Sequence, residues 1–197
     1  PARSRWRDSH LRKRLMGAAA LGLCSTTSHA AALDLALGQD TASLVYLTDT
    51  ASMGYGGADL GFGGFFNNDD DIMVTGNFLV TGSPGQNIPL QFGVGAKAYY
   101  ADLDSNRDAS AIGIGGQVRY LFPTETDIAF AVEGYYAPRI TSFEDADSLA
   151  EFNPRFELEI VPGTHAFVGY RWIEFDMDGG RDEELSDEVN VGIRLTF

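Results

Sequence analysis

The amino-acid sequence predicts an all-β fold, a small antiparallel up-and-down transmembrane β-barrel. Three observations lead to this prediction. Apolar and polar residues alternate along nearly every segment after residue 30, the first 30 residues have the pattern of an export signal, and the last ten form an amphipathic strand ending in Phe197. Period-two alternation indicates β-structure because successive side chains of a strand point to opposite faces of the sheet.

Residues 1–30 are interpreted as a signal peptide, and residues 31–197 as one outer-membrane β-barrel domain. Six Lys and Arg residues precede the apolar run Leu15–Cys24, and Ser28 and Ala30 supply small residues at the −3 and −1 positions of a cleavage site. The run is too short to span a bilayer as a helix. We therefore expect export across the inner membrane.

The composition of the exported part excludes several classes of protein. Beyond residue 30 there are 27 acidic residues against eight Lys and Arg, so the net charge changes from −14 for the whole chain to −19. Such acidity argues against nucleic-acid binding, which needs Lys and Arg to neutralise phosphates. The one cysteine, Cys24, lies in the leader, so neither a disulfide nor a thiolate metal site is expected.

The predicted elements follow one another between turn signals rich in Gly, Pro, Asn and Asp. The first segment, Ala32–Thr48, is ambiguous, since Gln39-Asp40 would turn it into a hairpin. The clearest strand, Ile128–Ala137, places Phe130 and Val132 opposite Glu133. The remaining strands are predicted at residues 55–66, 72–81, 88–101, 111–122, 151–161, 166–177 and 188–197.

The lengths of the connections predict the topology. Counted back from Phe197, they alternate between long and short, and barrels of the outer membrane have short periplasmic turns and longer outer loops. With both ends of the wall in the periplasm, the number of strands is even. Ten strands result if Ala32–Thr48 is a hairpin, and eight if it lies outside the wall; we favour ten.

A soluble β-sandwich or a lipocalin-like periplasmic binding barrel is the competing interpretation. Such a protein would place the apolar face inside and the polar face outside, and the alternation by itself fits both arrangements. The leader, the terminal Phe197 and the charges on one face of several strands favour the membrane barrel.

If the apolar face meets lipid, the charged face lines the lumen. The predicted lumen residues are Asp59, Lys97, Arg119, Glu133, Arg155, Glu157, Glu159, Arg171 and Arg194. Buried charges must be paired or solvated, and the interior of a small barrel is narrow enough for side chains to fill it. We expect an occluded, ion-paired lumen with an envelope-structural role; the alternative is a narrow channel for ions or small solutes.

The expected partners are outer-membrane lipid and lipopolysaccharide, and the barrel assembly machinery, which would recognise Phe197. The predicted outer loops are acidic, so divalent cations that bridge them to lipopolysaccharide are a further possibility; the loops are residues 67–71, 102–108, 144–147 and 182–188. We expect no cofactor and no enzyme, because His165, the one histidine after the leader, has no serine that alternates toward it.

Several short segments resemble the YfaZ family of outer-membrane proteins. They are Leu33–Leu35, Gly93–Tyr100, Glu133–Pro138, Gly169–Ile173 and Val191–Phe197, and the similarity rests on their order along the chain. The resemblance implies a small outer-membrane β-barrel of a Gram-negative bacterium. It implies no settled activity, so it assigns no catalytic or ligand-binding residue, although it supports Arg171 as a lumen residue.

Overall fold

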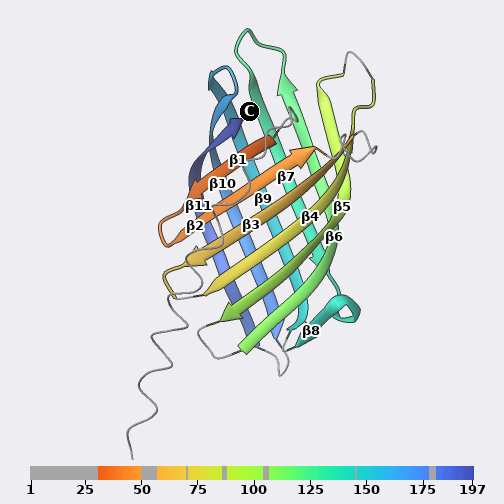
Figure 1. Ribbon diagram of the computed structural model, residues 1–197, viewed down its shortest axis with the longest axis vertical. Helices are drawn as coiled ribbons and strands as arrows, with labels where there is room; N and C mark the ends of the chain where they lie inside the picture. The colour runs from red at the N-terminus through yellow and green to blue at the C-terminus, as the bar shows by residue number, and fades with distance from the viewer. Residues whose placement is uncertain are drawn as a thin grey trace, which may run out of the picture.

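The computed structural model describes residues 31–49, 57–69, 71–85, 88–103, 107–144, 146–177 and 181–197. The predicted signal peptide, residues 1–30, lies outside this range. Among the described residues, no helix is long and apolar enough to cross a membrane. The structure there is a closed antiparallel barrel (Figure 1).

Ten strands of the described chain form the wall, which confirms the favoured count. They are β1 (Ala31–Leu37), β2 (Thr41–Asp49), β3 (Ala58–Asn67), β4 (Ile72–Gly82), β5 (Leu90–Leu103), β6 (Arg107–Phe122), β7 (Ile128–Ala137), β9 (Ala146–Val161), β10 (Thr164–Met177) and β11 (Arg181–Thr196). A 3₁₀ turn, η2 (Arg139–Thr141), leads into an extra short strand, β8 (Ser142–Glu144), which pairs with β6. The ambiguous segment Ala32–Thr48 is therefore the hairpin β1–β2.

The wall closes where its first and last strands meet. β1 pairs antiparallel with β11, and Ala31 and Phe197 exchange two backbone hydrogen bonds of 3.0 and 2.9 Å. The pairing of β5 with β6 joins the two halves of the sheet. We call the end of the barrel that carries Ala31, Phe197 and the turn Pro162–Gly163 the terminal rim. The opposite end, which carries η2 and β8, is the distal rim (Figure 1).

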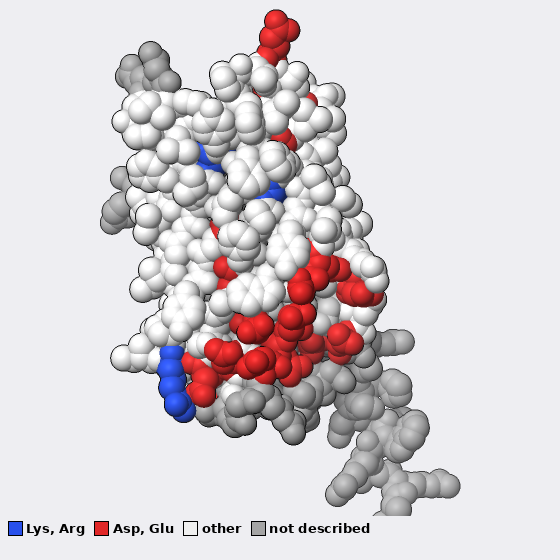
Figure 2. Space-filling view, turned by 180° about the vertical axis from the view of Figure 1, so that it is seen from behind, with Lys and Arg blue, Asp and Glu red and all other residues white. Residues whose placement is uncertain are grey.

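The outer face of the wall is apolar along most of its height. Large apolar or aromatic side chains are exposed on all ten described wall strands, such as Phe62 and Phe66 on β3 and Tyr136 on β7. Toward the distal rim this surface gives way to acids, which gather at one end of the molecule in Figure 2. On β10, for example, Val168, Tyr170 and Trp172 are followed by Glu174 and Asp176. The outer face therefore has an apolar band bounded by an acidic rim.

The long connections predicted from the sequence are wrong, because the strands continue into them. β9 begins at Ala146 rather than Glu151, β11 at Arg181 rather than Glu188, and β6 at Arg107 rather than Ala111. The ends look like loop sequence because acids replace apolar residues on the outward face of the wall near the distal rim. The acidic segment 182–188 is thus part of a strand.

The interior has two layers, and the sequence analysis predicted only one of them. The half near the terminal rim is charged, as expected. The half near the distal rim is filled by a layer of apolar side chains that are no more than 3% exposed, which we call the apolar plug: Leu103, Leu149, Ile173, Phe175, Met177 and Leu185. The plug is a hydrophobic core inside the barrel, and it lies between the charged layer and the distal rim.

Candidate functional site

The candidate site is the cavity between the terminal rim and the apolar plug, which we call the vestibule. Its volume is about 380 Å³. Its lining begins at Ala31, Asp127 and Thr196 on the terminal rim and ends at Phe65 and Ile173 beside the plug. Among the described residues the vestibule is therefore a blind chamber, approached from the end where the first and last strands meet.

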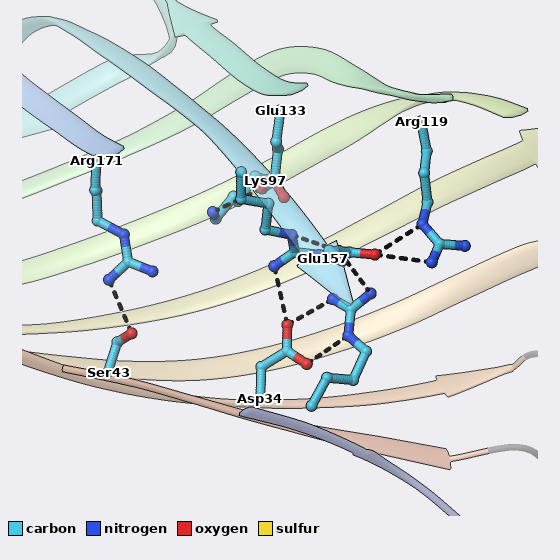
Figure 3. A network of polar contacts seen from close by, with 9 residues as sticks. Asp34, Ser43, Lys97, Arg119, Glu133, Glu157 and Arg171 are labelled. Atoms are coloured by element: carbon cyan, nitrogen blue, oxygen red, sulfur yellow. Dashed lines mark hydrogen bonds and ion pairs between the residues drawn. The ribbon is translucent and has the colours of Figure 1, made fainter. Parts of the chain in front are cut away.

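Glu157 on β9 is the centre of the largest ion-pair cluster in the vestibule wall (Figure 3). Its carboxylate lies 2.8 Å from Nη2 of Arg119 on β6, 2.7 Å from Nε of Arg155 on the same strand, and 3.6 Å from Nη1 of Arg194 on β11. One buried carboxylate thus joins three guanidinium groups from three strands.

Asp34 on β1 completes this cluster from the other side of the seam. Arg194, its register partner on β11, donates two hydrogen bonds of 2.5 Å to its carboxylate, and Arg155 donates a third of 3.1 Å. Charge-assisted bidentate pairs of this kind combine strength with a fixed geometry. The pair therefore holds the first strand against the last.

Lys97 on β5 forms a second cluster nearer the plug. Its ammonium lies 3.3 Å from Glu133 on β7 and 2.8 Å from Glu151 on β9. It also lies 5.4 and 5.3 Å from the ring centroids of Tyr99 and Tyr135, within the range of cation–π attraction. The Tyr99 hydroxyl donates a 2.5 Å hydrogen bond to Glu151, so this buried lysine is enclosed by two carboxylates and two aromatic rings.

Arg171 on β10 is the exception among the vestibule cations. Its Nη1 donates a 2.8 Å hydrogen bond to the Ser43 hydroxyl on β2, and its guanidinium lies 5.7 Å from the Phe65 ring centroid. Within the described part of the chain it forms no ion pair with a carboxylate. It lies one inward-facing position from Ile173, at the floor of the vestibule.

The structure brings most of the nine predicted lumen residues together. Lys97 pairs with Glu133, and Arg119, Arg155 and Arg194 surround Glu157, whereas Arg171 lies apart. Asp59 lines the vestibule near the terminal rim without an ion pair in the described residues. Glu159 accepts the backbone N–H of Gly163 at 3.1 Å, so it stabilises a turn and stands outside the cluster.

Two carboxylates of the network were missed by the sequence analysis. Asp34 and Glu151 are buried acids that hold Arg194 and Lys97, respectively. Both follow the alternation that identified the other lumen residues, since Asp34 stands between Leu33 and Leu35, and Glu151 precedes Phe152. Their position on the polar face was a sufficient signal for lumen placement.

The acidic distal rim contains the group that best fits the predicted divalent cations. Carboxylate oxygens of Glu174, Asp176 and Asp182 lie within 4.8 Å of one another. Partial desolvation and the neighbouring charges of Asp182, Asp176 and Glu184 raise the pKa of Glu174 above its usual 4.5. Hard cations prefer carboxylate oxygens, although exposed acids of this kind are common without a cation.

His165 lies in the vestibule wall beside the Pro162–Gly163 turn. Its buried Nδ1 has no hydrogen-bond partner in the described residues. A Ser-His hydrolase needs its histidine hydrogen-bonded to the nucleophile and to an orienting acid. His165 therefore supplies no assembled catalytic pair in the described structure.

The chain is similar to one protein family and to several solved structures, of which two are described. A family model described as YfaZ precursor matches residues 11–197. No curated protein matches. The outer membrane channel DcaP of Acinetobacter baumannii is 11% identical with a TM-score of 0.42, over 88% of this chain and 55% of that one. A bacterial polysaccharide outer membrane secretin is 13% identical with a TM-score of 0.44, over 82% and 57%. The chain thus spans just over half the length of each.

Proposed function

The chain belongs to the YfaZ family, and from that premise we propose that it is an integral β-barrel of the outer membrane of a Gram-negative bacterium. In this proposal the protein is non-enzymatic, its lumen is closed, and its role is structural within the envelope.

The observation that carries the proposal is the inverted arrangement of the wall. Large apolar side chains such as Val94, Ile114 and Val189 are more than 60% exposed on the outer face, while ion pairs fill the interior near the terminal rim. A soluble barrel would place these faces the other way round. In water, so large an exposed apolar surface would drive aggregation, whereas in lipid it is the stable arrangement.

The two rims suggest the orientation in the membrane. Barrels of this class have both chain ends in the periplasm, which would place the terminal rim and the vestibule mouth there. The acidic distal rim would then face lipopolysaccharide, whose phosphates attract divalent cations. Cations bridging the rim carboxylates to those phosphates are part of the proposal.

The apolar plug supports a closed lumen. Leu149 and Phe175 are 0% exposed, and Ile173 and Met177 are 1% exposed, so the described chain leaves no solvated route between them. Ions cross a narrow apolar constriction poorly because they lose their hydration without gaining a partner. The charged layer between the plug and the terminal rim contains both positive and negative side chains, whereas selective pores have rings of side chains with one sign of charge.

Membrane insertion and closure are tested separately. Carbonate washing of membranes should leave the protein in the pellet, because an integral wall is not released by high pH; release into the supernatant would support a soluble periplasmic barrel. Purified protein in planar bilayers should then give no reproducible unitary conductance steps.

A narrow channel for ions or small solutes is the second candidate, and the vestibule is the observation that favours it. A chamber of about 380 Å³ lined by charged and polar side chains already lies inside the barrel. Reproducible unitary steps that disappear in Arg155→Gln would establish the channel and refute closure, since Arg155 lies in the vestibule wall.

A further inference from the structure

Both signs of charge line the vestibule, with the carboxylates of Asp34, Asp49, Asp59, Asp127, Glu133 and Glu151 beside five Lys and Arg side chains. Glu133 is 23% exposed, whereas the other carboxylates that form ion pairs are recessed behind their partners. Side chains of Asp34, Glu151 and Glu157 are 9%, 3% and 2% exposed. Those of Arg119 and Arg194 are 21% and 19% exposed. Glu157, the hub of the cluster, does not line the cavity, whereas all three of its arginine partners do.

Arg171 differs from the other lining cations, because no carboxylate of the described residues contacts its guanidinium. A guanidinium has five N–H donors in a planar fork, and a buried one is ordinarily paired with carboxylates. Within the described residues Arg171 has one hydroxyl acceptor, Ser43, and one ring face, Phe65. Both contacts fix the orientation of the Arg171 guanidinium, but neither partner carries a negative charge. The group lines the cavity, so its remaining donors are available to whatever occupies the vestibule.

We propose that the vestibule is a binding site for a small oxyanion, a solute with a carboxylate or phosphate group, and that Arg171 is its anchor. Guanidinium groups bind both kinds of oxyanion through two parallel hydrogen bonds. The volume of about 380 Å³ lies in the range of small-molecule pockets.

The mouth and the floor of the chamber limit the class of solute. Asp59 and Asp127 line the vestibule near the terminal rim, so they oppose the entry of polyanions and favour solutes with one or two negative charges. Phe65, Met73 and Ile173 line the floor around Arg171 and offer apolar contacts to a short carbon chain. The proposal rests on the closed lumen, because a solute bound beneath the plug leaves by the mouth through which it entered.

The test is calorimetric titration of the full barrel in detergent micelles with succinate and, separately, inorganic phosphate at constant ionic strength. Choline serves as a cation of similar size. We expect one saturable site for at least one of the two anions and none for choline. The anion that binds more tightly distinguishes a carboxylate site from a phosphate site.

Arg171→Gln should weaken the binding at least tenfold, and Arg171→Lys should weaken it less. Arg171→Gln leaves no carboxylate unpaired, so the variant should fold, as judged by heat-modifiable gel migration. The matched control is Arg139→Gln, which removes a 77% exposed arginine from the distal rim and should leave the affinity unchanged.

The inference would be overturned if neither anion binds, if choline binds as tightly as the anion, or if folded Arg171→Gln keeps the wild-type affinity. If Arg171→Gln does not fold, nitrogen-15 NMR of the wild-type arginine side chains decides, since the anion must shift the Arg171 Nε–H resonance. These outcomes can be told apart from the outcomes that test whether the lumen is closed. Unitary conductance with retained binding would refute only closure, whereas no conductance and no binding would refute only the oxyanion site.

Discussion

At the scale of single residues, the lumen is organised by a few carboxylates that each hold several cations. Removing water from a charge costs several kcal/mol, and the cost is recovered only if the charge is well paired. Glu157 meets this condition with Arg119, Arg155 and Arg194. The importance of a residue here therefore depends on how many partners it holds together, and charge alone does not determine it.

Glu157→Gln should destabilise the barrel by about 3–5 kcal/mol, because it leaves buried guanidinium groups without their shared anion. The measurement is urea-induced unfolding in micelles, followed by the fluorescence of Trp172. Glu159→Gln is the control, since an amide oxygen can still accept the Gly163 N–H. If both variants lost the same amount of unfolding free energy, Glu157 would not be the centre of the ion-pair cluster.

Glu174 gives a pH-dependent prediction outside the membrane-crossing part of β10, whose outer apolar face ends at Trp172. Its pKa is raised in the folded barrel, so the folded state binds the proton more readily than the unfolded chain does. Its contribution to stability is therefore present below about pH 4.5 and is lost as the pH rises through the raised pKa.

Carbon-13 NMR titration of the Glu174 carboxyl measures this pKa directly. Asp182→Asn removes the neighbouring charge that raises the Glu174 pKa most and should lower this pKa toward 4.5. Asp102→Asn changes a carboxylate that does not act on Glu174 and should leave the pKa unchanged. A Glu174 pKa at or below 4.5 in the wild type would contradict the prediction.

At the scale of elements, the described wall strands have an apolar outer face and, along the vestibule, a charged and polar inner face. On β5, Phe92, Val94 and Tyr100 are exposed outward, while Lys97 and Tyr99 point into the lumen. Beyond Tyr100, the outer face continues with exposed Asp102. The change from apolar to acidic side chains marks where the strand passes out of the apolar band.

Val94→Arg should destabilise the barrel by about 2–4 kcal/mol in lipid, because it places a charge on the lipid-facing side near mid-height. Ile140→Arg is the control, since Ile140 lies on η2 at the distal rim and is 84% exposed. Unfolding titrations in lipid vesicles compare the two. A soluble barrel would tolerate both substitutions equally well, so equal stabilities would count against the membrane assignment.

At the scale of the whole molecule, a charged vestibule and an apolar plug divide one lumen. A barrel of ten strands has room for both a packed core and a small chamber. The core sits near the distal rim, where β5, β6, β9, β10 and β11 all extend past the apolar band. The extensions thus supply most of the side chains of the apolar plug.

Replacing both Leu149 and Phe175 by Ala should open a conducting path, because these plug side chains are fully buried and their removal leaves a cavity that the surrounding side chains fill only in part. Planar-bilayer recordings should show unitary steps in the double variant and none in the wild type. Phe156→Ala removes an aromatic ring from the outer face and should show no unitary conductance steps. If the double variant also shows no unitary steps, the barrier to ion passage does not lie at Leu149 and Phe175.

Much of this architecture is determined by local sequence. Alternation identified the strands, the two-faced wall and seven of the residues that line the charged layer, because the direction of a strand side chain depends only on its position in the pleat. The acidic strand ends were mistaken for loops, since their outward faces carry acids, although their inward faces keep buried apolar side chains such as Leu149 and Leu185. Asp34 and Glu151 shared the signal but were not singled out.

The partners of those residues were decided only by the tertiary structure. Arg194 meets Asp34 because closure of the barrel brings β11 beside β1, 160 positions away in the sequence. The apolar plug exists because Leu103, Leu149 and Phe175 converge inside the same closed wall from strands far apart in the chain. The sequence by itself determined which side chains point inward; the register and closure of the sheet decided which of them meet, and so where the interior is charged and where it is apolar.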